Sequence, residues 1–141
     1  MSVKEQIEQL VRRQEKAVQQ KNVDEAMAHY SVDIVSCDVV NTLQKNGKDA
    51  CRDRLLSWLS QFPQEFSYNV ENLSVMTTDE LAVCYSFNHV KGKLVDGNEI
   101  DMRWRSTVCY GKTGSEWLIA HEHSSVPFDP ENGKALINLE E

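Results

Sequence analysis

The 141-residue chain lacks several features that would assign it to a specialised class of protein. No run of 18 apolar residues occurs, and the opening MSVKEQIEQL lacks the apolar core of a signal peptide. Lys and Arg do not cluster, and the formal net charge is −7, which disfavours nucleic acid and anionic membrane surfaces as partners. We therefore expect a cytoplasmic protein with no nucleic-acid or membrane partner.

A cysteine pattern for a metal or a disulfide is also missing, because the four cysteines are scattered without a C-x-x-C pair. In a reducing compartment they are predicted to be free thiols. A Gly-rich phosphate loop, a Ser-His-Asp order and an H-E-x-x-H motif are also missing, so hydrolase and nucleotide-binding functions lack support. The length and a hydrophobic content of 40% predict a single globular domain over 1–141, with residues 128–141 as a loosely attached tail.

Helical patterns precede strand patterns along the chain, which predicts an α+β fold with helices on one face of a curved, mostly antiparallel sheet. Apolar residues recur at helical spacing near the start, Asn22 can cap a second helix, and Asp96-Gly97 is a strong hairpin signal. The predicted elements are helices over 3–21 and 22–30, a strand over 32–40, a helix between Gly47 and Pro63, and strands over 66–76, 81–94, 98–110 and 116–126.

The hairpins predict a strand register, and hence which side chains share a face. A two-residue turn at Asp96-Gly97 sets Asn88 opposite Arg105, and a loop at 111–115 sets Arg105 opposite His121. One face is then apolar near the 111–115 loop, where it suits packing under the helices, and polar at its other end. A β-bulge in either strand would reverse the assignment beyond it. The side chains expected at the polar end are Asn88, Asp101, Arg103, Arg105, His121, His123 and Ser125.

The opposite face of the predicted sheet is apolar, and such a surface favours association with a second copy. We expect a homodimer through this face, with Tyr85, Phe87, Trp104 and Tyr110 in the interface. In the alternative arrangement, the apolar face packs on the helices and the Arg/His face lies in solvent.

The segment RSTVCYGKTGSEWLIAHEHSSVPF resembles the end of domains in the SnoaL-like, ketosteroid-isomerase-like branch of the nuclear-transport-factor-2-like superfamily. QQKNVDEAMAHYSVDIVSCD is similar to the opening of these domains. The resemblance implies a cystatin-like cone with a pocket at its open end, usually dimeric. The family includes isomerases, cyclases, dehydratases, epoxide hydrolases and non-catalytic association domains, so the fold alone does not define a reaction. The matching residues are Arg105, Thr107, Trp117, Ile119, His121, His123, Ser125 and Pro127.

The same resemblance places Asp38 where steroid isomerases hold their general base. A carboxylate in an apolar cone suits proton transfer at a carbon next to a carbonyl. The isomerases' oxyanion-holding tyrosine matches Gln14, however, and their second aspartate falls near Ser106. Classical steroid isomerase activity is therefore not expected.

The cationic side chains suggest a different oxyanion site. Arg103 and Arg105 are multi-donor groups, and His121 and His123 add further donors, a set that suits a carboxylate or enolate. In the alternative, Asp38 and the acidic residue at 101 neutralise the arginines as a buried ion-pair network. The histidines have a structural alternative too, bonded to Asp101, Ser125 or backbone.

The two histidines of His-x-His could chelate a metal if a third ligand completed the set. Asp38 is the only obvious carboxylate, since Glu122 is expected on the opposite face. Neighbouring arginines would repel a cation. We therefore expect neither a metal nor a cofactor.

These observations predict a pocket for an anionic or carbonyl-bearing small molecule, with isomerase-, cyclase- or dehydratase-type proton transfer as the candidate reaction. The alternatives are a non-catalytic association module and an epoxide hydrolase, the latter suggested by Asp101-x-Arg103. The candidate catalytic residues are Asp38, Arg105, His121 and His123, and the candidate ligand-binding residues are Arg103, Asn88, Thr107, Trp58, Tyr30 and Ser125.

Overall fold

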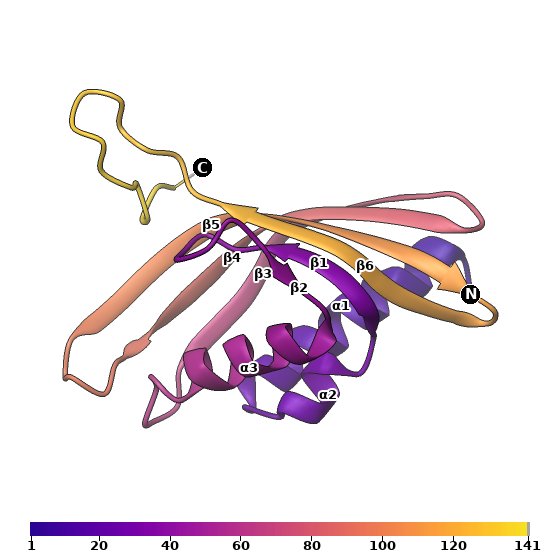
Figure 1. Cartoon of the computed structure of the whole chain (residues 1–141), viewed down its shortest axis with the longest axis horizontal. Helices are drawn as coiled ribbons and strands as arrows, with labels where there is room; N and C mark the ends of the chain where they lie inside the picture. The colour runs from indigo at the N-terminus through magenta and orange to yellow at the C-terminus, as the bar shows by residue number, and fades with distance from the viewer. Residues whose placement is uncertain (141) are drawn as a thin grey trace.

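Three helices lie on one face of a curved six-stranded sheet in the computed structural model, which describes residues 1–140 (Figure 1). This is the predicted α+β arrangement. Strand β1 pairs in parallel with β6, all other neighbours are antiparallel, and the sheet order is β2-β1-β6-β5-β4-β3. The elements are α1 Val3–Gln19, α2 Val23–Met27, β1 Tyr30–Cys37, β2 Lys45–Asn46, α3 Lys48–Leu59, β3 Ser67–Thr77, β4 Leu81–Lys93, β5 Glu99–Thr113 and β6 Glu116–Ser125.

The helix ends follow from local chemistry. The Ser2 side chain accepts a hydrogen bond from the backbone N–H of Glu5 at the start of α1, and Asn22 caps α2 in the same way, as predicted. Gly47 precedes α3 with a φ of 93°, a left-handed value that favours glycine. Within residues 1–140, no helix combines the length and apolar character needed to cross a membrane.

The β4–β5 hairpin differs from the prediction by one residue. Residues 94–98 connect the strands, and the Leu94 N–H donates to the Asn98 carbonyl, which leaves a loop of three residues, 95–97, inside this pair. Gly97 in this loop has a φ of 87°. Asn88 therefore pairs with Trp104 instead of Arg105. Because side chains alternate along a strand, this shift turns Trp104 toward the helices and Arg105 away from them.

The β5–β6 hairpin also differs from the prediction. The strands continue to a tight turn, so Thr113 pairs with Glu116, and the register shifts between Cys109 and Tyr110. Tyr110 pairs with Ile119 but Cys109 pairs with His121, which leaves Ala120 as the extra residue of a bulge. Trp117 and Ile119 are buried under the helices, whereas His121 and His123 lie on the outer face.

The core lies between the inner face of the sheet and the helices. Tyr110 is 1% exposed and Trp117 5% exposed, so both are core residues. Tyr110 and Trp104 therefore do not belong to the outer face predicted for the dimer, whereas Tyr85 and Phe87 do lie there.

After β6 the chain forms a loop that extends from the body of the domain (Figure 1). Phe128 forms a β-bridge with Ala135, and the Ile137 carbonyl accepts a 2.7 Å hydrogen bond from the Arg103 N–H. The tail thereby bonds to β5 beyond the point where β6 ends.

Candidate functional site

A large cavity lies between the helices and the inner face of the sheet. Its volume is about 860 Å³, within the range of small-molecule sites. Trp58 of α3 and Trp104 of β5 meet edge to face in its wall, with ring centroids 6.3 Å apart. The apolar wall also contains Val11, Leu55, Leu73, Ile100, Met102 and Val108.

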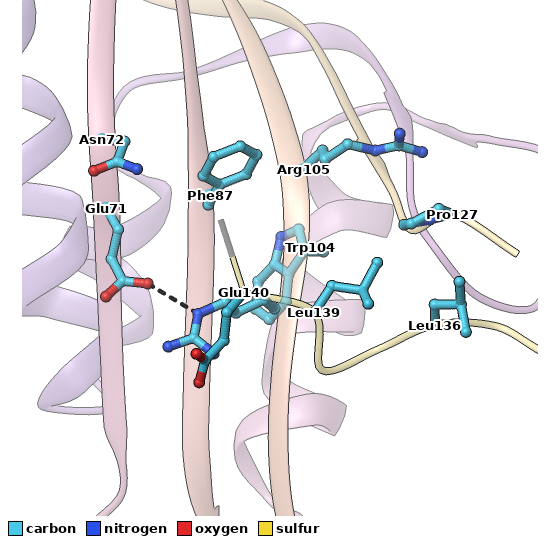
Figure 2. Close-up of a pocket in the computed structure, with 10 residues that line it drawn as sticks. Glu71, Asn72, Phe87, Trp104, Arg105, Pro127, Leu136, Leu139 and Glu140 are labelled. Atoms are coloured by element: carbon cyan, nitrogen blue, oxygen red, sulfur yellow. Dashed lines mark hydrogen bonds and ion pairs between the residues drawn. The ribbon is translucent and has the colours of Figure 1, made fainter.

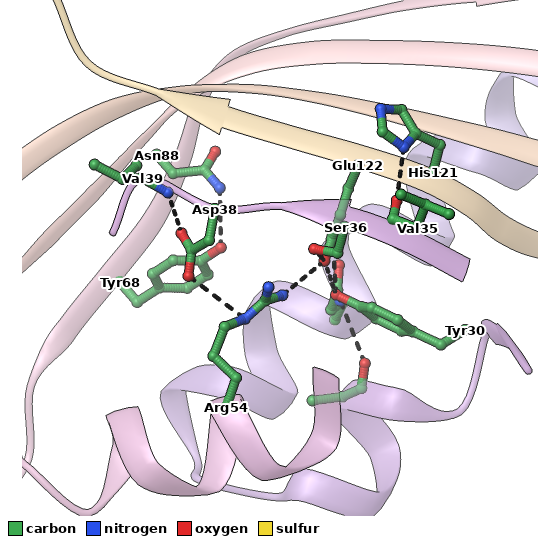
Figure 3. Close-up of polar contacts among 12 residues, drawn as sticks. Tyr30, Val35, Ser36, Asp38, Val39, Arg54, Tyr68, Asn88, His121 and Glu122 are labelled. Carbon is green, nitrogen blue, oxygen red and sulfur yellow. Dashed lines mark hydrogen bonds and ion pairs between the residues drawn. The ribbon is translucent and has the colours of Figure 1, made fainter. Parts of the chain in front are cut away.

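Arg54 is the central cation of this cavity, and it comes from α3 (Figure 3). Its Nη2 lies 3.1 Å from Glu122 Oε1, and its Nε lies 3.4 Å from Asp38 Oδ2. Its Nη1 is buried without a hydrogen-bond partner in the part of the chain that the structure describes. Burial alone would lower the pKa of the Arg54 guanidinium, but the two carboxylates raise it above its usual value, so Arg54 stays charged.

Glu122 is held by three donors from two elements, β1 and α3. It accepts hydrogen bonds from the Tyr30 hydroxyl at 3.0 Å, from the Ser36 hydroxyl at 2.9 Å and from Arg54. Gln14 in turn donates to the Tyr30 oxygen at 3.1 Å. Burial and the neighbouring carboxylate raise the pKa of Tyr30 well above its usual range, so its hydroxyl remains a donor. Glu122 was expected on the opposite face, and the bulge at Ala120 turns it inward.

Asp38 follows β1 at the wall of the cavity. One carboxylate oxygen accepts a 2.7 Å hydrogen bond from the Val39 N–H, and the other faces Arg54. Its side chain is 32% exposed, so a ligand in the cavity can reach it. Counting the contacts within residues 1–140, the Asp38 carboxylate can still accept further hydrogen bonds, unlike that of Glu122.

Tyr68 supplies a neutral donor to the same cavity. Ser86 donates to the Asn88 side-chain oxygen at 2.8 Å, and the Asn88 amide donates to the Tyr68 oxygen at 3.0 Å. The Tyr68 proton has no acceptor within residues 1–140, and burial raises the pKa of its hydroxyl well above the usual range. Tyr68 is therefore oriented by its neighbours and ready to donate to a ligand.

Four of the ten residues predicted from the sequence for the site line this cavity: Asp38, Asn88, Trp58 and Tyr30. The other six share the outer face of the sheet, because the one-residue shift between β4 and β5 separates Arg105 from Asn88 and the two histidines stay on the face of Arg105. The prediction that the Arg and His side chains converge inside the cone is therefore wrong. The six are Arg103, Arg105, Thr107, His121, His123 and Ser125.

On the outer face the cationic residues have separate partners. Arg103 pairs with Glu71 at 3.3 Å, and Arg105 donates to the Ser125 hydroxyl at 3.1 Å. Asp101 contacts His89 at 2.6 Å and does not join Asp38 in a shared network. A smaller hollow of about 480 Å³ lies beside Arg103 and Arg105, between the sheet and the tail (Figure 2).

Sequence reasoning missed Arg54, Glu122 and Tyr68. A signal for Arg54 exists: it lies between Cys51 and Leu55, which face inward at helical spacing, so its own side chain borders that face. Glu122 carries no such signal, since its orientation depends on the bulge. Tyr68 lies on the predicted strand 66–76, which sequence reasoning did not connect to the site.

Residues 7–129 match the SnoaL-like domain family. The chain belongs to this family. A nuclear-transport-factor-2-like protein of unknown function from Pseudomonas putida is 30% identical to this SnoaL-like domain, with a TM-score of 0.89 over 98% of this chain and 96% of that one. No curated protein matches the sequence.

Two more distant solved structures share the fold of this SnoaL-like domain. A candidate calcium/calmodulin-dependent protein kinase II association domain from Xanthomonas campestris has 20% identity and a TM-score of 0.72 over 85% of this chain and 84% of that one. A candidate dehydratase of the nuclear-transport-factor-2-like family from Streptomyces avermitilis has 10% identity and a TM-score of 0.74 over 86% and 94%. Other similar structures have a cystatin-like fold, in agreement with the cone.

Proposed function

We propose that the cavity binds a small, mainly apolar molecule through a carbonyl oxygen, and that Asp38 transfers a proton at the carbon next to that carbonyl. The observation that carries this proposal is an apolar-walled cavity holding two unused donors beside a carboxylate. The donors are Arg54 Nη1 and the Tyr68 hydroxyl. The carboxylate is Asp38, which contacts Arg54.

The charges of the cavity favour a neutral ligand over an anion. Three carboxylates and two cations line it among residues 1–140, so its formal charge is −1. An anionic ligand would meet net repulsion, whereas a carbonyl oxygen can accept hydrogen bonds without adding charge. The ionisable lining groups are Asp38, Lys45, Asp53, Arg54 and Glu122.

The reaction places each group in a definite role. Asp38 accepts a proton from the α-carbon, and the electron pair of the broken C–H bond forms an enolate. The Tyr68 O–H and Arg54 N–H stabilise the negative charge on the enolate oxygen, the usual electrostatic contribution in such sites. Returning the proton to another carbon isomerises the ligand, and expelling a β-hydroxyl group as water dehydrates it. The candidate dehydratase from Streptomyces avermitilis shares the fold and supports this class of reaction.

Proton transfer can be tested with 2-tetralone, a neutral bicyclic ketone with acidic α-protons. We expect the wild type to accelerate exchange of these protons for deuterium in D₂O, measured by NMR, and Asp38→Asn to lower the acceleration about 100-fold or more, the usual contribution of a general base. Asp33→Asn, on the exposed part of β1, is the matched control and should keep the wild-type rate. Equal rates in Asp38→Asn and wild type would exclude Asp38 as the base.

Binding is tested separately from catalysis with the hydrocarbon tetralin and the anion 2-naphthoate as comparison ligands. We expect 2-tetralone to bind more tightly than either, and Tyr68→Phe to weaken ketone binding about three- to tenfold while leaving tetralin unchanged, because one hydrogen bond is lost. Calorimetry measures all three. Tighter binding of 2-naphthoate would contradict the neutral-ligand proposal, and no binding of any probe would favour the non-catalytic association module.

We also propose that the domain forms a homodimer through the outer face of the sheet, in a patch that includes Tyr85 and Phe87 but not Trp104 or Tyr110. Tyr85 is 48% exposed and Leu81 is 62% exposed on this face. Sedimentation of the wild type should give a dimer at micromolar concentration, and Tyr85→Glu should shift it toward monomer. A wild-type monomer at that concentration would contradict the proposal.

A further inference from the structure

We infer that Cys37, His121 and His123 form a zinc site on the outer face of the sheet. The sulfur and one ring nitrogen of each histidine all lie within 4.8 Å of one another. The three residues come from two adjacent parallel strands, in which Cys37 pairs with His123 and Val35 pairs with His121. Of the three residues only Cys37 also borders the cavity, which the same strands line with Ser36 and Glu122 from the opposite face.

The hydrogen bond of His121 prepares it to bind a metal. Its Nδ1 lies 2.6 Å from the Val35 carbonyl oxygen (Figure 3). A carbonyl oxygen only accepts, so Nδ1 carries the proton and Nε2 keeps its lone pair. Histidines that bind metals typically donate their other ring N–H to a carbonyl or carboxylate in this way.

The distances require only side-chain adjustment. Zn–S and Zn–N bonds of about 2.3 and 2.0–2.1 Å place tetrahedral ligand atoms about 3.4–3.6 Å apart. Atoms within 4.8 Å can reach that spacing by closing about 1 Å through rotation of the side chains. The ring centroids of the two histidines are 6.5 Å apart with planes at 76°, so the rings do not stack against each other.

The donor set selects the metal. One thiolate and two imidazoles suit a borderline-soft ion such as Zn²⁺ and not Mg²⁺ or Ca²⁺, which take oxygen ligands. Arginine repulsion is weak here, because solvent screens the charge of the exposed Arg105 and Arg103 is paired with Glu71. The sequence-based expectation considered Asp38 as the third ligand, whereas the structure provides its neighbour, Cys37.

A bound ion would link two strands and would keep one coordination position open. It would tie the end of β1 to β6, where the chain leaves the sheet toward Asp38. Three protein ligands leave a fourth tetrahedral position for water, and in the monomer the exposed His123 gives the ion access from solvent.

The site is tested by titrating the reduced, metal-free, untagged protein with Co²⁺ as a spectroscopic substitute for zinc. We expect one equivalent to produce a thiolate-to-cobalt charge-transfer band and tetrahedral ligand-field bands, and Zn²⁺ to displace both. Zn²⁺ should also raise Tm, since an ion that binds the folded state stabilises it, while Mg²⁺ should not.

Two variants and two controls assign the ligands. Cys37→Ser should abolish the charge-transfer band, and His123→Ala, an exposed position that folding tolerates, should weaken cobalt binding at least tenfold. Cys109→Ser, on the same face, and His89→Ala, on β4, should both keep wild-type binding. No saturable band, a band that survives in Cys37→Ser, or an equal loss in Cys109→Ser would overturn the assignment. None of these measurements involves a ligand in the cavity.

Discussion

Tyr110→Ala is expected to lower the free energy of unfolding by about 3–5 kcal/mol, the usual cost of truncating a buried aromatic residue. The Tyr110 side chain is 1% exposed on the inner face of β5, where no neighbour can fill the space it leaves without moving the sheet or α1. Urea unfolding followed by circular dichroism measures the change, with an unchanged m-value as the check that the folded state is intact.

Tyr85→Ala is the matched control, because Tyr85 lies on the adjacent strand but on the outer face and is 48% exposed. In dilute, monomeric protein it should change stability by no more than about 0.5 kcal/mol, as surface substitutions usually do. The register predicted from the sequence placed both tyrosines in one exposed patch. Equal effects of the two substitutions would therefore support that register against the one in the structure.

Glu122→Gln is expected to destabilise the fold by about 3 kcal/mol and to lower Tm by about 10 °C. After this carboxylate is removed, the Arg54 charge keeps Asp38 as its remaining partner. The expected loss of stability is therefore at the low end of the range for broken buried ion pairs. The Tyr30 and Ser36 hydroxyls also lose a charged acceptor. Calorimetry in chelator-treated buffer measures the effect without a metal on the flanking histidines.

Glu116→Gln provides the control for this substitution, since Glu116 begins the same strand and is exposed. It should leave Tm nearly unchanged. The double variant Arg54→Met/Glu122→Leu removes both charges and should be less destabilised than the sum of its two single variants, because neither ion is left unpaired. Strict additivity of the two single effects would show that the ion pair does not couple these residues.

The candidate site was predictable only where it depended on local patterns. Tyr30 begins a recognisable strand, Asp38 follows it, and Trp58 lies on the inward face of a helix, so their positions in the cavity follow from the order of elements. Arg54 borders that same helical face and could have been included. Glu122 could not, because its inward direction comes from one extra residue, Ala120, that no hairpin rule specifies.

The sequence by itself determined the helices, every strand except the two-residue β2 and, on β5, which side chains share a face. Met102, Trp104 and Tyr110 do lie together, as do Arg103 and Arg105. Only the tertiary structure decided which of these two sets meets the helices. The side-chain period of a strand is two residues, so the one-residue shift in the β4–β5 hairpin is enough to exchange the faces, and burial of Trp104 and Tyr110 against the helices favours the observed choice.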